Sequence, residues 1–199
     1  LAYAAALLKH NNFDVELVDA IAEGKSYGTF LKQIKKTNPQ LLVCETSTVS
    51  LTHDMRLLKK IGHDIPIAIC GPDITIRQPS FLQKYPFIKY VFVGEYEFTL
   101  LELAANLEAN NSLNEVLGLI YRDSGSIKVT PSRPLADLNK MPWPLREGLL
   151  MERYSDAPGD MPLPSVQMLA SRGCPYSCKF CLWPQVMYQS NQYRTRDIK

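Results

Sequence analysis

Alternation of helical and strand-like patterns over the first 110 residues is the feature that most constrains this fold. Amphipathic or Ala/Leu-rich spacing predicts helices, and short apolar or alternating runs predict strands between them. The predicted helices are residues 1–9, 26–36, 51–61, 75–84 and 95–107, and the predicted strands are residues 14–19, 41–44, 65–70 and 90–93. Strands that alternate with helices of this length form right-handed βαβ units on a parallel sheet.

Two residues mark helix boundaries within this pattern. Ser26 is a suitable N-cap for the second helix, and Pro79 predicts a break in the fourth. Because the chain opens directly on a helix, we expect a strand of the sheet to precede residue 1. The first part of the chain is therefore expected to be a Rossmann-like, doubly wound parallel α/β sheet whose ligands gather at the carboxyl ends of its strands.

The pattern changes after about residue 112. Residues 118–122 and 127–129 flank an Asp-Ser-Gly turn and predict a β-hairpin. A proline-rich stretch over residues 131–164 predicts a connector, and residues 166–170 predict a new strand. We expect three parts: the Rossmann-like domain at 1–112, the hairpin and connector at 113–164, and the truncated start of a second domain at 165–199.

Composition narrows the class of protein. The net charge is +2, so no strong field favours nucleic acid or a membrane surface as a partner. No apolar run reaches the roughly 18 residues that a transmembrane segment needs. Five unevenly placed cysteines argue against a secreted disulfide framework and favour a reducing, cytoplasmic setting.

Three of these cysteines lie within eight residues near the end of the chain. Three residues separate Cys174 from Cys178, and two separate Cys178 from Cys181. This spacing brings three thiolates to one point, as soft metals and iron–sulfur clusters require. A structural zinc site needs a fourth ligand, and the three histidines all fall in the first domain. Zinc binding and unligated or redox cysteines remain as alternatives.

The cysteine loop resembles the signature of the radical S-adenosylmethionine superfamily, including the aromatic Phe180 directly before the last cysteine. The resemblance implies a [4Fe–4S] cluster on the three cysteines, with S-adenosylmethionine on its open iron and Phe180 near the adenine. It also implies an external electron donor. The lead-in at residues 171–175 looks like the end of the first strand of that family's partial (β/α) barrel. Tyr176 and Trp183 are candidates to cover the cluster.

The upstream half is similar to the cobalamin-binding domain that precedes many such cores. The similarity is carried by residues 1–20, 70–72 and 93–103, and it continues into the connector at residues 134–144. It implies that the nucleotide tail of cobalamin enters the sheet at the strand ends.

Small and flexible residues stand where such a tail would enter. The candidate contacts are Thr46, Ser47, Thr48, Gly71, Gly94 and Glu95. Small hydroxylic side chains would line the slot, and the glycines would allow a close approach. The alternative is that these loops are ordinary turns that close a parallel sheet.

Together the resemblances imply a cobalamin-dependent radical S-adenosylmethionine enzyme. The expected reaction is methyl transfer to an unactivated carbon of a small molecule or of a lipid or polysaccharide precursor. Radical cyclisation or ring contraction is an alternative, and so is a non-catalytic corrinoid-binding module with a structural metal site. Arg194 and Arg196 are expected to start a helix on a solvated face rather than to bind an anionic substrate.

Overall fold

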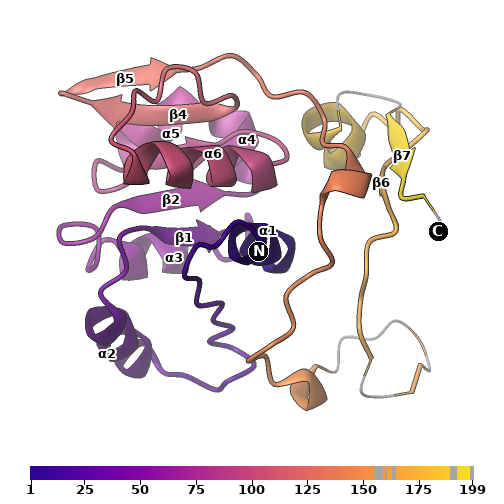
Figure 1. The fold of residues 1–199 in the computed structure, drawn as a ribbon, viewed down its shortest axis with the longest axis horizontal. Helices are drawn as coiled ribbons and strands as arrows, with labels where there is room; N and C mark the ends of the chain where they lie inside the picture. Colours follow the sequence, from indigo (N-terminus) through magenta and orange to yellow (C-terminus); the bar gives the residue numbers. More distant parts are fainter. Residues whose placement is uncertain (155–158, 160, 163–164, 189–191, 198–199) are drawn as a thin grey trace.

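A parallel-rich sheet forms the centre of the protein in a computed structural model that describes residues 1–154, 159, 161–162, 165–188 and 192–197 (Figure 1). Its strand order is β1-β2-β3-β4-β5. The first three strands are parallel, whereas β4 and β5 form an antiparallel hairpin beside β3. The strands are β1 (Leu42–Glu45), β2 (Ile67–Cys70), β3 (Tyr90–Phe92), β4 (Leu119–Asp123) and β5 (Ser126–Val129). The predicted α/β sheet is confirmed, and the predicted hairpin extends it.

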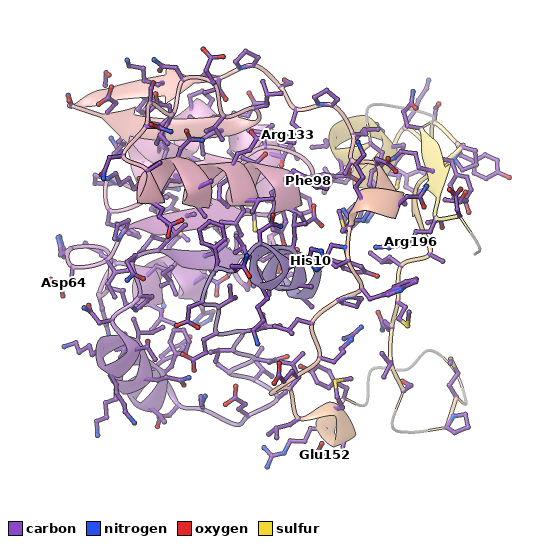
Figure 2. The ribbon with its side chains drawn as sticks, in the orientation of Figure 1. His10, Asp64, Phe98, Arg133, Glu152 and Arg196 are labelled. Atoms are coloured by element: carbon purple, nitrogen blue, oxygen red, sulfur yellow. The ribbon has the colours of Figure 1, made fainter. Side chains whose placement is uncertain are left out.

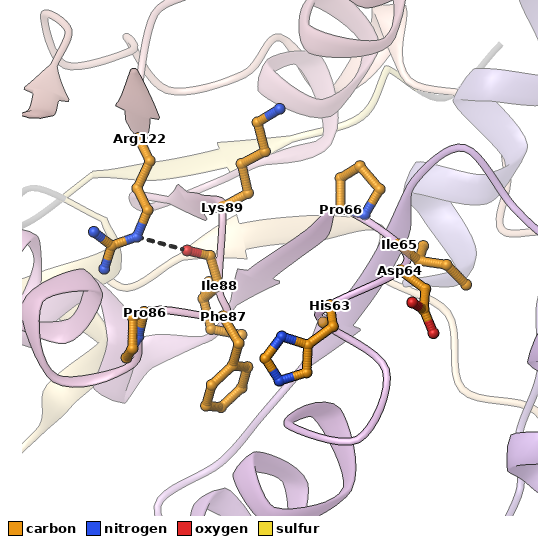
Figure 3. A pocket seen from close by; sticks show the side chains of 10 residues that line it. His63, Asp64, Ile65, Pro66, Pro86, Phe87, Ile88, Lys89 and Arg122 are labelled. Carbon is orange, nitrogen blue, oxygen red and sulfur yellow. Dashed lines mark hydrogen bonds between the residues drawn. The ribbon is translucent and has the colours of Figure 1, made fainter. Parts of the chain in front are cut away.

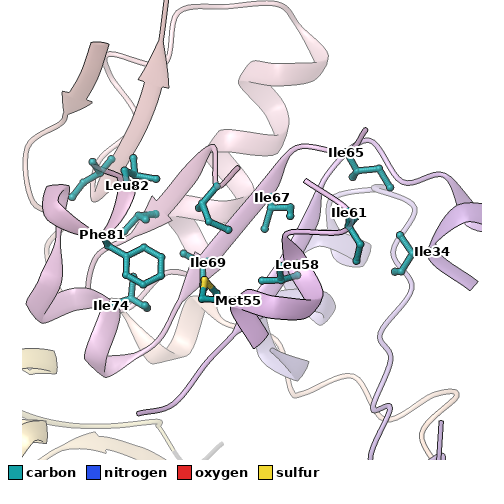
Figure 4. Packing of buried hydrophobic residues seen from close by; sticks show 13 residues of the cluster. Ile34, Met55, Leu58, Ile61, Ile65, Ile67, Ile69, Ile74, Phe81 and Leu82 are labelled. Carbon is teal, nitrogen blue, oxygen red and sulfur yellow. The ribbon is translucent and has the colours of Figure 1, made fainter. Parts of the chain in front are cut away.

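Helices cover both faces of the sheet, as a doubly wound fold requires. Residues of α2, α3, α4 and α5 share one apolar cluster with the sheet (Figure 4), and residues of α1 and α6 share the other. The helices are α1 (Ala2–His10), α2 (Tyr27–Thr37), α3 (Leu51–Leu58), α4 (Pro72–Arg77), α5 (Pro79–Lys84) and α6 (Glu97–Glu108). No described helix combines the length and apolar character needed to cross a bilayer.

The central strand β2 shows why both faces are buried. Ile67 and Ile69 pack into the cluster of α2–α5, while Ala68 and Cys70 pack into the cluster of α1 and α6. All four residues are fully buried. A strand covered on both sides is apolar at every position, because alternation with polar residues occurs only where one face meets water.

Both predicted helix boundaries are confirmed. The Ser26 hydroxyl accepts a hydrogen bond from the Thr29 amide at 3.2 Å and so caps α2. Gln78 has a φ of 45°, which separates α4 from α5 immediately before Pro79.

The predicted strand at residues 14–19 is wrong. Phe13 and Val15 are partly buried against the apolar cluster of α1 and α6, so apolar side chains of this stretch do contact the core. The backbone of this stretch has no strand beside it, since β1 pairs only with β2 among the described residues. A period-two pattern specifies which side chains are buried, but a strand also needs a neighbour for its backbone groups.

The strand predicted at residues 166–170 is also wrong in position. The strand is β6 (Ser171–Gly173), and it pairs in antiparallel fashion with β7 (Tyr193–Thr195). The pair lies on the side of the sheet towards which the β2 arrow points (Figure 1). It contains no parallel strands, so the partial barrel stays a prediction. Along the chain, the short helical turns η1 (Leu138–Lys140) and η2 (Met151–Arg153) come after β5 and before β6. The π-helical turn η3 (Trp183–Met187) comes between β6 and β7.

Replacing Ile69 by Ala should lower the free energy of unfolding by about 2–5 kcal/mol, because a fully buried side chain is lost and a cavity remains. Urea denaturation followed by circular dichroism measures the change. The control is Ile21→Ala, at a side chain that is 94% exposed, which should leave stability nearly unchanged. Equal effects of the two substitutions would contradict the core described above.

Candidate functional site

A buried network of ion pairs joins the carboxyl end of β3 to the β6–β7 pair. Glu95 and Glu97 follow β3, whereas Arg172 belongs to β6 and Arg194 to β7. Arg172 Nη2 donates to Glu97 Oε1 at 2.6 Å, and Arg194 Nη2 donates to Glu95 Oε1 at 2.5 Å. The side chains of Arg172, Glu95 and Glu97 are less than a tenth exposed. Removing one partner of such a buried pair costs about 3–5 kcal/mol, since it leaves an uncompensated charge.

The Glu95 side chain is engaged by other parts of the protein, and its expected contact to a cofactor stays a prediction. Its two carboxylate oxygens accept hydrogen bonds from Arg194 and from the Ala136 amide, and Arg172 Nη1 lies 3.7 Å away. The pattern of residues could not reveal this, because the partners of Glu95 lie 41 to 99 positions along the chain.

Arg194 and Arg196 do not start a solvated helix, so that expectation is wrong. Arg194 lies within β7, Arg196 directly follows the strand, and both side chains are half-buried. Arg196 lies 4.3 Å from the ring centroid of Trp143 and 5.8 Å from that of Tyr3, and it donates to the carbonyl oxygen of Met141 at 2.7 Å. Figure 2 shows Arg196 between the connector and β7.

The β6–β7 pair presents the cysteine loop. Gly173 has a φ of 100°, and a Cβ at this position would lie 1.7 Å from the Gln192 carbonyl oxygen. Only glycine permits this approach of the two strands. The Cys174 amide then donates to the same carbonyl at 3.0 Å, and Gln185 Nε2 donates to the Cys178 carbonyl at 2.8 Å. The start of the loop is thus fixed by a backbone contact, and its middle is held by the Gln185 side chain.

The three cysteines of the loop are free thiols. Cys178 is exposed, and Cys174 and Cys181 are half-buried. Within the described part of the chain, no three His, Cys, Asp or Glu side chains are arranged to hold a metal ion. The donor set nevertheless has the chemistry that an iron–sulfur cluster requires, because three soft ligands lie on one accessible loop. Their assignment as cluster ligands stays a prediction.

The aromatic residues around the loop are open to solvent. Phe180 is 93% exposed and Tyr176 is 69% exposed. Trp183 is about half exposed and stacks on Tyr188 at 5.8 Å between ring centroids. The proposed roles of Phe180 beside an adenine and of Tyr176 and Trp183 over a cluster also stay predictions.

The hydroxylic loop after β1 divides into an internal part and an open part. Thr46 is buried, and its hydroxyl donates to Asp54 Oδ2 at 2.5 Å on α3. Ser47 and Ser50 exchange hydrogen bonds at the start of the same helix. Thr46 therefore stabilises the loop itself, whereas Ser47 and Thr48 are exposed and available to a ligand.

The two predicted glycines serve different purposes. Gly71 has a φ of 132°, and a Cβ there would lie 2.2 Å from the Thr46 carbonyl oxygen, so this glycine allows two loops of the protein to meet. Gly94 has a φ of 72° and open space around its Cβ position. Thr75, which the sequence analysis missed, connects them by donating to the Gly71 carbonyl and accepting from the Gly94 amide.

A cavity of about 350 Å³ adjoins Gly94. Gly94 and Glu95 line one side, the connector residues 132–135 a second, and Gln185 to Met187 of η3 a third. Gln185 also contacts the cysteine loop, so the cavity lies between the predicted cobalamin edge and the predicted cluster site.

A second cavity, of about 360 Å³, lies away from this edge (Figure 3). Its lining includes His63, Phe87, Lys89 and Arg122, at the amino ends of β2 and β3. Arg122 is engaged there, since its Nε donates to the Ile88 carbonyl oxygen at 3.2 Å. This cavity does not belong to the candidate site.

Sequence comparison finds relatives along nearly the whole chain. An uncharacterized methyltransferase of Pyrococcus horikoshii is 32% identical over 91% of this chain and 39% of its own length. The anaerobic magnesium-protoporphyrin IX monomethyl ester cyclase of Rubrivivax gelatinosus is 27% identical over 100% of this chain and 36% of its own length. The cobalamin-dependent radical SAM methyltransferase TokK of Streptomyces tokunonensis is 26% identical over 73% of this chain and 22% of its own length. No family model matches the chain.

Solved structures share the fold. The cobalamin-dependent S-adenosylmethionine radical enzyme OxsB, with aqua-cobalamin and S-adenosylmethionine bound, matches 98% of this chain and 26% of its own, with a TM-score of 0.79 and 22% identity. The radical S-adenosylmethionine methyltransferase TsrM of Kitasatospora setae, with cobalamin and a [4Fe–4S] cluster bound, matches 98% of this chain and 40% of its own, with a TM-score of 0.68 and 17% identity.

The relatives of the chain thus include two methyltransferases, of which TokK is a cobalamin-dependent radical SAM enzyme, and an anaerobic cyclase. The chain shares its fold with a solved cobalamin-dependent S-adenosylmethionine radical enzyme. The resemblance in the sequence is thus confirmed, and the cofactors of the structural neighbours are those that the sequence predicts. The chain spans 39% or less of the length of each of these three curated relatives.

Substituting Ala at Gly71 and at Gly94 should separate the two glycine roles. Gly71→Ala should lower stability by about 3 kcal/mol or more, because it adds a backbone clash to an unfavourable φ. Gly94→Ala should cost about 1–2 kcal/mol, from backbone strain alone. Thermal denaturation of the two variants tests this order, and a larger loss for Gly94→Ala would contradict it.

Thiol alkylation of the metal-free protein at pH 8 should modify Cys178 first and Cys70 and Cys44 last. Cys70 is fully buried, and burial together with Asp54 and Glu45 raises the pKa of Cys44 to about 12. Only about one Cys44 thiol in ten thousand is then ionised at pH 8. Its labelling rate should climb as the pH approaches 12. Mass spectrometry of the digested protein measures each rate, and rapid labelling of Cys44 at pH 8 would contradict its raised pKa.

Proposed function

We propose that this chain supplies the cobalamin-binding part and the cluster loop of a radical S-adenosylmethionine methyltransferase. The observation that carries the proposal is the position of the cysteine loop. Its three free thiols lie on the side of the sheet where the parallel strands end, and the fold is shared with a cobalamin-bound enzyme. Three parts are proposed: the sheet domain at 1–112, the hairpin and connector at 113–164, and the start of the radical core at 165–199.

Cys174, Cys178 and Cys181 are the proposed ligands of the [4Fe–4S] cluster. When bound, the cluster supplies the electron that cleaves S-adenosylmethionine reductively. The loop would need to draw the three sulfurs together, which its exposed middle around Cys178 permits. Phe180 is the proposed contact to the adenine, and Tyr176 and Trp183 are the side chains available to exclude water. Free thiols persist in a reducing compartment such as the cytoplasm, which is the proposed location. An external electron donor is proposed as the partner that would reduce the cluster.

Cobalamin is proposed to bind at the carboxyl ends of β1 to β3. The exposed hydroxyls of Ser47 and Thr48 and the open space beside Gly94 support this position. Thr46, Gly71 and Glu95 stabilise this edge through contacts within the protein. Thr46 donates to Asp54, Gly71 packs against the Thr46 carbonyl oxygen, and Glu95 pairs with Arg194. The proposed methyl acceptor is an unactivated carbon of a small molecule or of a lipid or polysaccharide precursor.

Radical cyclisation is the second candidate function. Its support is the similarity to the cyclase of Rubrivivax gelatinosus, which extends over the whole of this chain. Product analysis separates the two reactions, since methyl transfer adds a carbon to the substrate and cyclisation does not.

Anaerobic reconstitution with iron and sulfide tests the cluster assignment. The chain should acquire the visible absorbance and the iron content of a [4Fe–4S] cluster, and Ala at Cys174, Cys178 or Cys181 should remove most of both, because each supplies one of three ligands. The matched control is Cys44→Ala, a cysteine outside the loop, which should retain the cluster.

The cleavage assay uses a longer protein that contains this segment, as the relatives do. After reconstitution, this protein should cleave S-adenosylmethionine under strong reductant. Full absorbance in all three loop variants would overturn the ligand assignment. A loaded protein that leaves S-adenosylmethionine intact would overturn the radical function and favour a corrinoid-binding module with a structural metal site.

A further inference from the structure

We propose that Glu95 and Glu97 are positioning residues that hold the cysteine loop in register with the carboxyl end of β3, through Arg172 and Arg194. The contacts themselves stand on the structure alone. Their purpose, to set the cluster site relative to the cobalamin edge, rests on the proposed function.

The two arginines are direct cross-strand neighbours in the β6–β7 ladder. Two like charges opposite each other destabilise an antiparallel pair unless opposite charges lie between them. Glu95 meets this need, since its Oε1 lies 2.5 Å from Arg194 Nη2 and 3.7 Å from Arg172 Nη1. Glu97 adds the 2.6 Å contact to Arg172 Nη2. The strand pair therefore depends on carboxylates from another part of the chain.

The same arginines bracket the loop. Arg172 precedes Cys174 by two residues, and Arg194 follows by two residues the Gln192 carbonyl that accepts from the Cys174 amide. A shift of either ion pair would therefore reach Cys174 through two residues of backbone. Gly173, which tolerates no side chain, keeps the segment closely packed.

Glu95 also fixes the connector. Its Oε2 accepts from the Ala136 amide at 2.9 Å, and Arg194 Nη1 donates to the Ala136 carbonyl at 2.6 Å. One carboxylate thus gathers the sheet, the connector and the loop-bearing strands at a point directly beside Gly94. Both carboxylate oxygens of Glu95 thus accept hydrogen bonds from within the protein, and neither is free for a ligand. A positioning role accounts for the burial of this charged side chain.

A second Arg–Glu pair supplies the matched control. Arg133 of the connector pairs with Glu102 on the same helix, α6, that begins with Glu97. The Glu102 side chain is 43% exposed, and its partner lies on the connector rather than on the β6–β7 pair. Glu102→Gln therefore removes the same type of pair from the same helix without touching the cysteine loop.

Hydrogen exchange of the metal-free protein tests the proposal. Glu95→Gln and Glu97→Gln should accelerate exchange of the Cys174 amide and of the β6–β7 amides at least about tenfold, while the amides of β2 and β3 keep their wild-type rates. Alkylation of Cys174 should accelerate with them. Glu102→Gln should change neither. Unchanged exchange at Cys174 in both variants would overturn the proposal.

Arg194→Lys keeps the charge but loses the forked contact, so it covers the case in which the glutamine variants unfold. It should show the same local acceleration with an intact sheet, and acceleration spread evenly over the sheet would instead overturn the proposal. In the loaded enzyme, Glu95→Gln should lower the product formed per S-adenosylmethionine cleaved more than the cleavage rate. Because the exchange is measured without cofactors, its outcome is independent of whether the proposed function holds.

Discussion

The buried contacts of Glu95 and Glu97 with Arg172 and Arg194 are the interaction on which the arrangement of this protein depends. The sheet and its two apolar clusters include none of these four side chains. The ion pairs instead join the β6–β7 pair to the residues that follow β3. Charges this deeply buried contribute little net stability and instead penalise every arrangement in which they are unpaired. The network therefore determines where the cysteine loop lies more than how stable the protein is.

Much of the sheet domain follows from local patterns. β2 is apolar at every position because both of its faces are covered, and Ser26 and Pro79 mark helix boundaries through contacts with their nearest neighbours. Residues 14–19 show the limit of such reasoning. Their alternation correctly indicates that Val15 is partly buried between two exposed acidic residues, yet strand formation depends on a partner that the local sequence does not specify.

The candidate site is predictable where its chemistry is local and unpredictable where it is not. The spacing of Cys174, Cys178 and Cys181 identifies the donor set directly. Arg194 has no such signal, since its partner Glu95 lies 99 positions earlier, and an arginine near a chain segment of mixed polarity is ordinarily solvated. Gly71 illustrates a third case, in which the glycine was found but its purpose, close packing against Thr46, required the structure.

The separation of these partners also sets an order of assembly. Glu95 and Glu97 leave the ribosome well before Arg172 and Arg194, and domains generally fold as units from the N-terminal side during synthesis. The sheet can thus be complete while its two carboxylates still face water. The cysteine loop acquires its place only when β7 has been synthesised and pairs with β6.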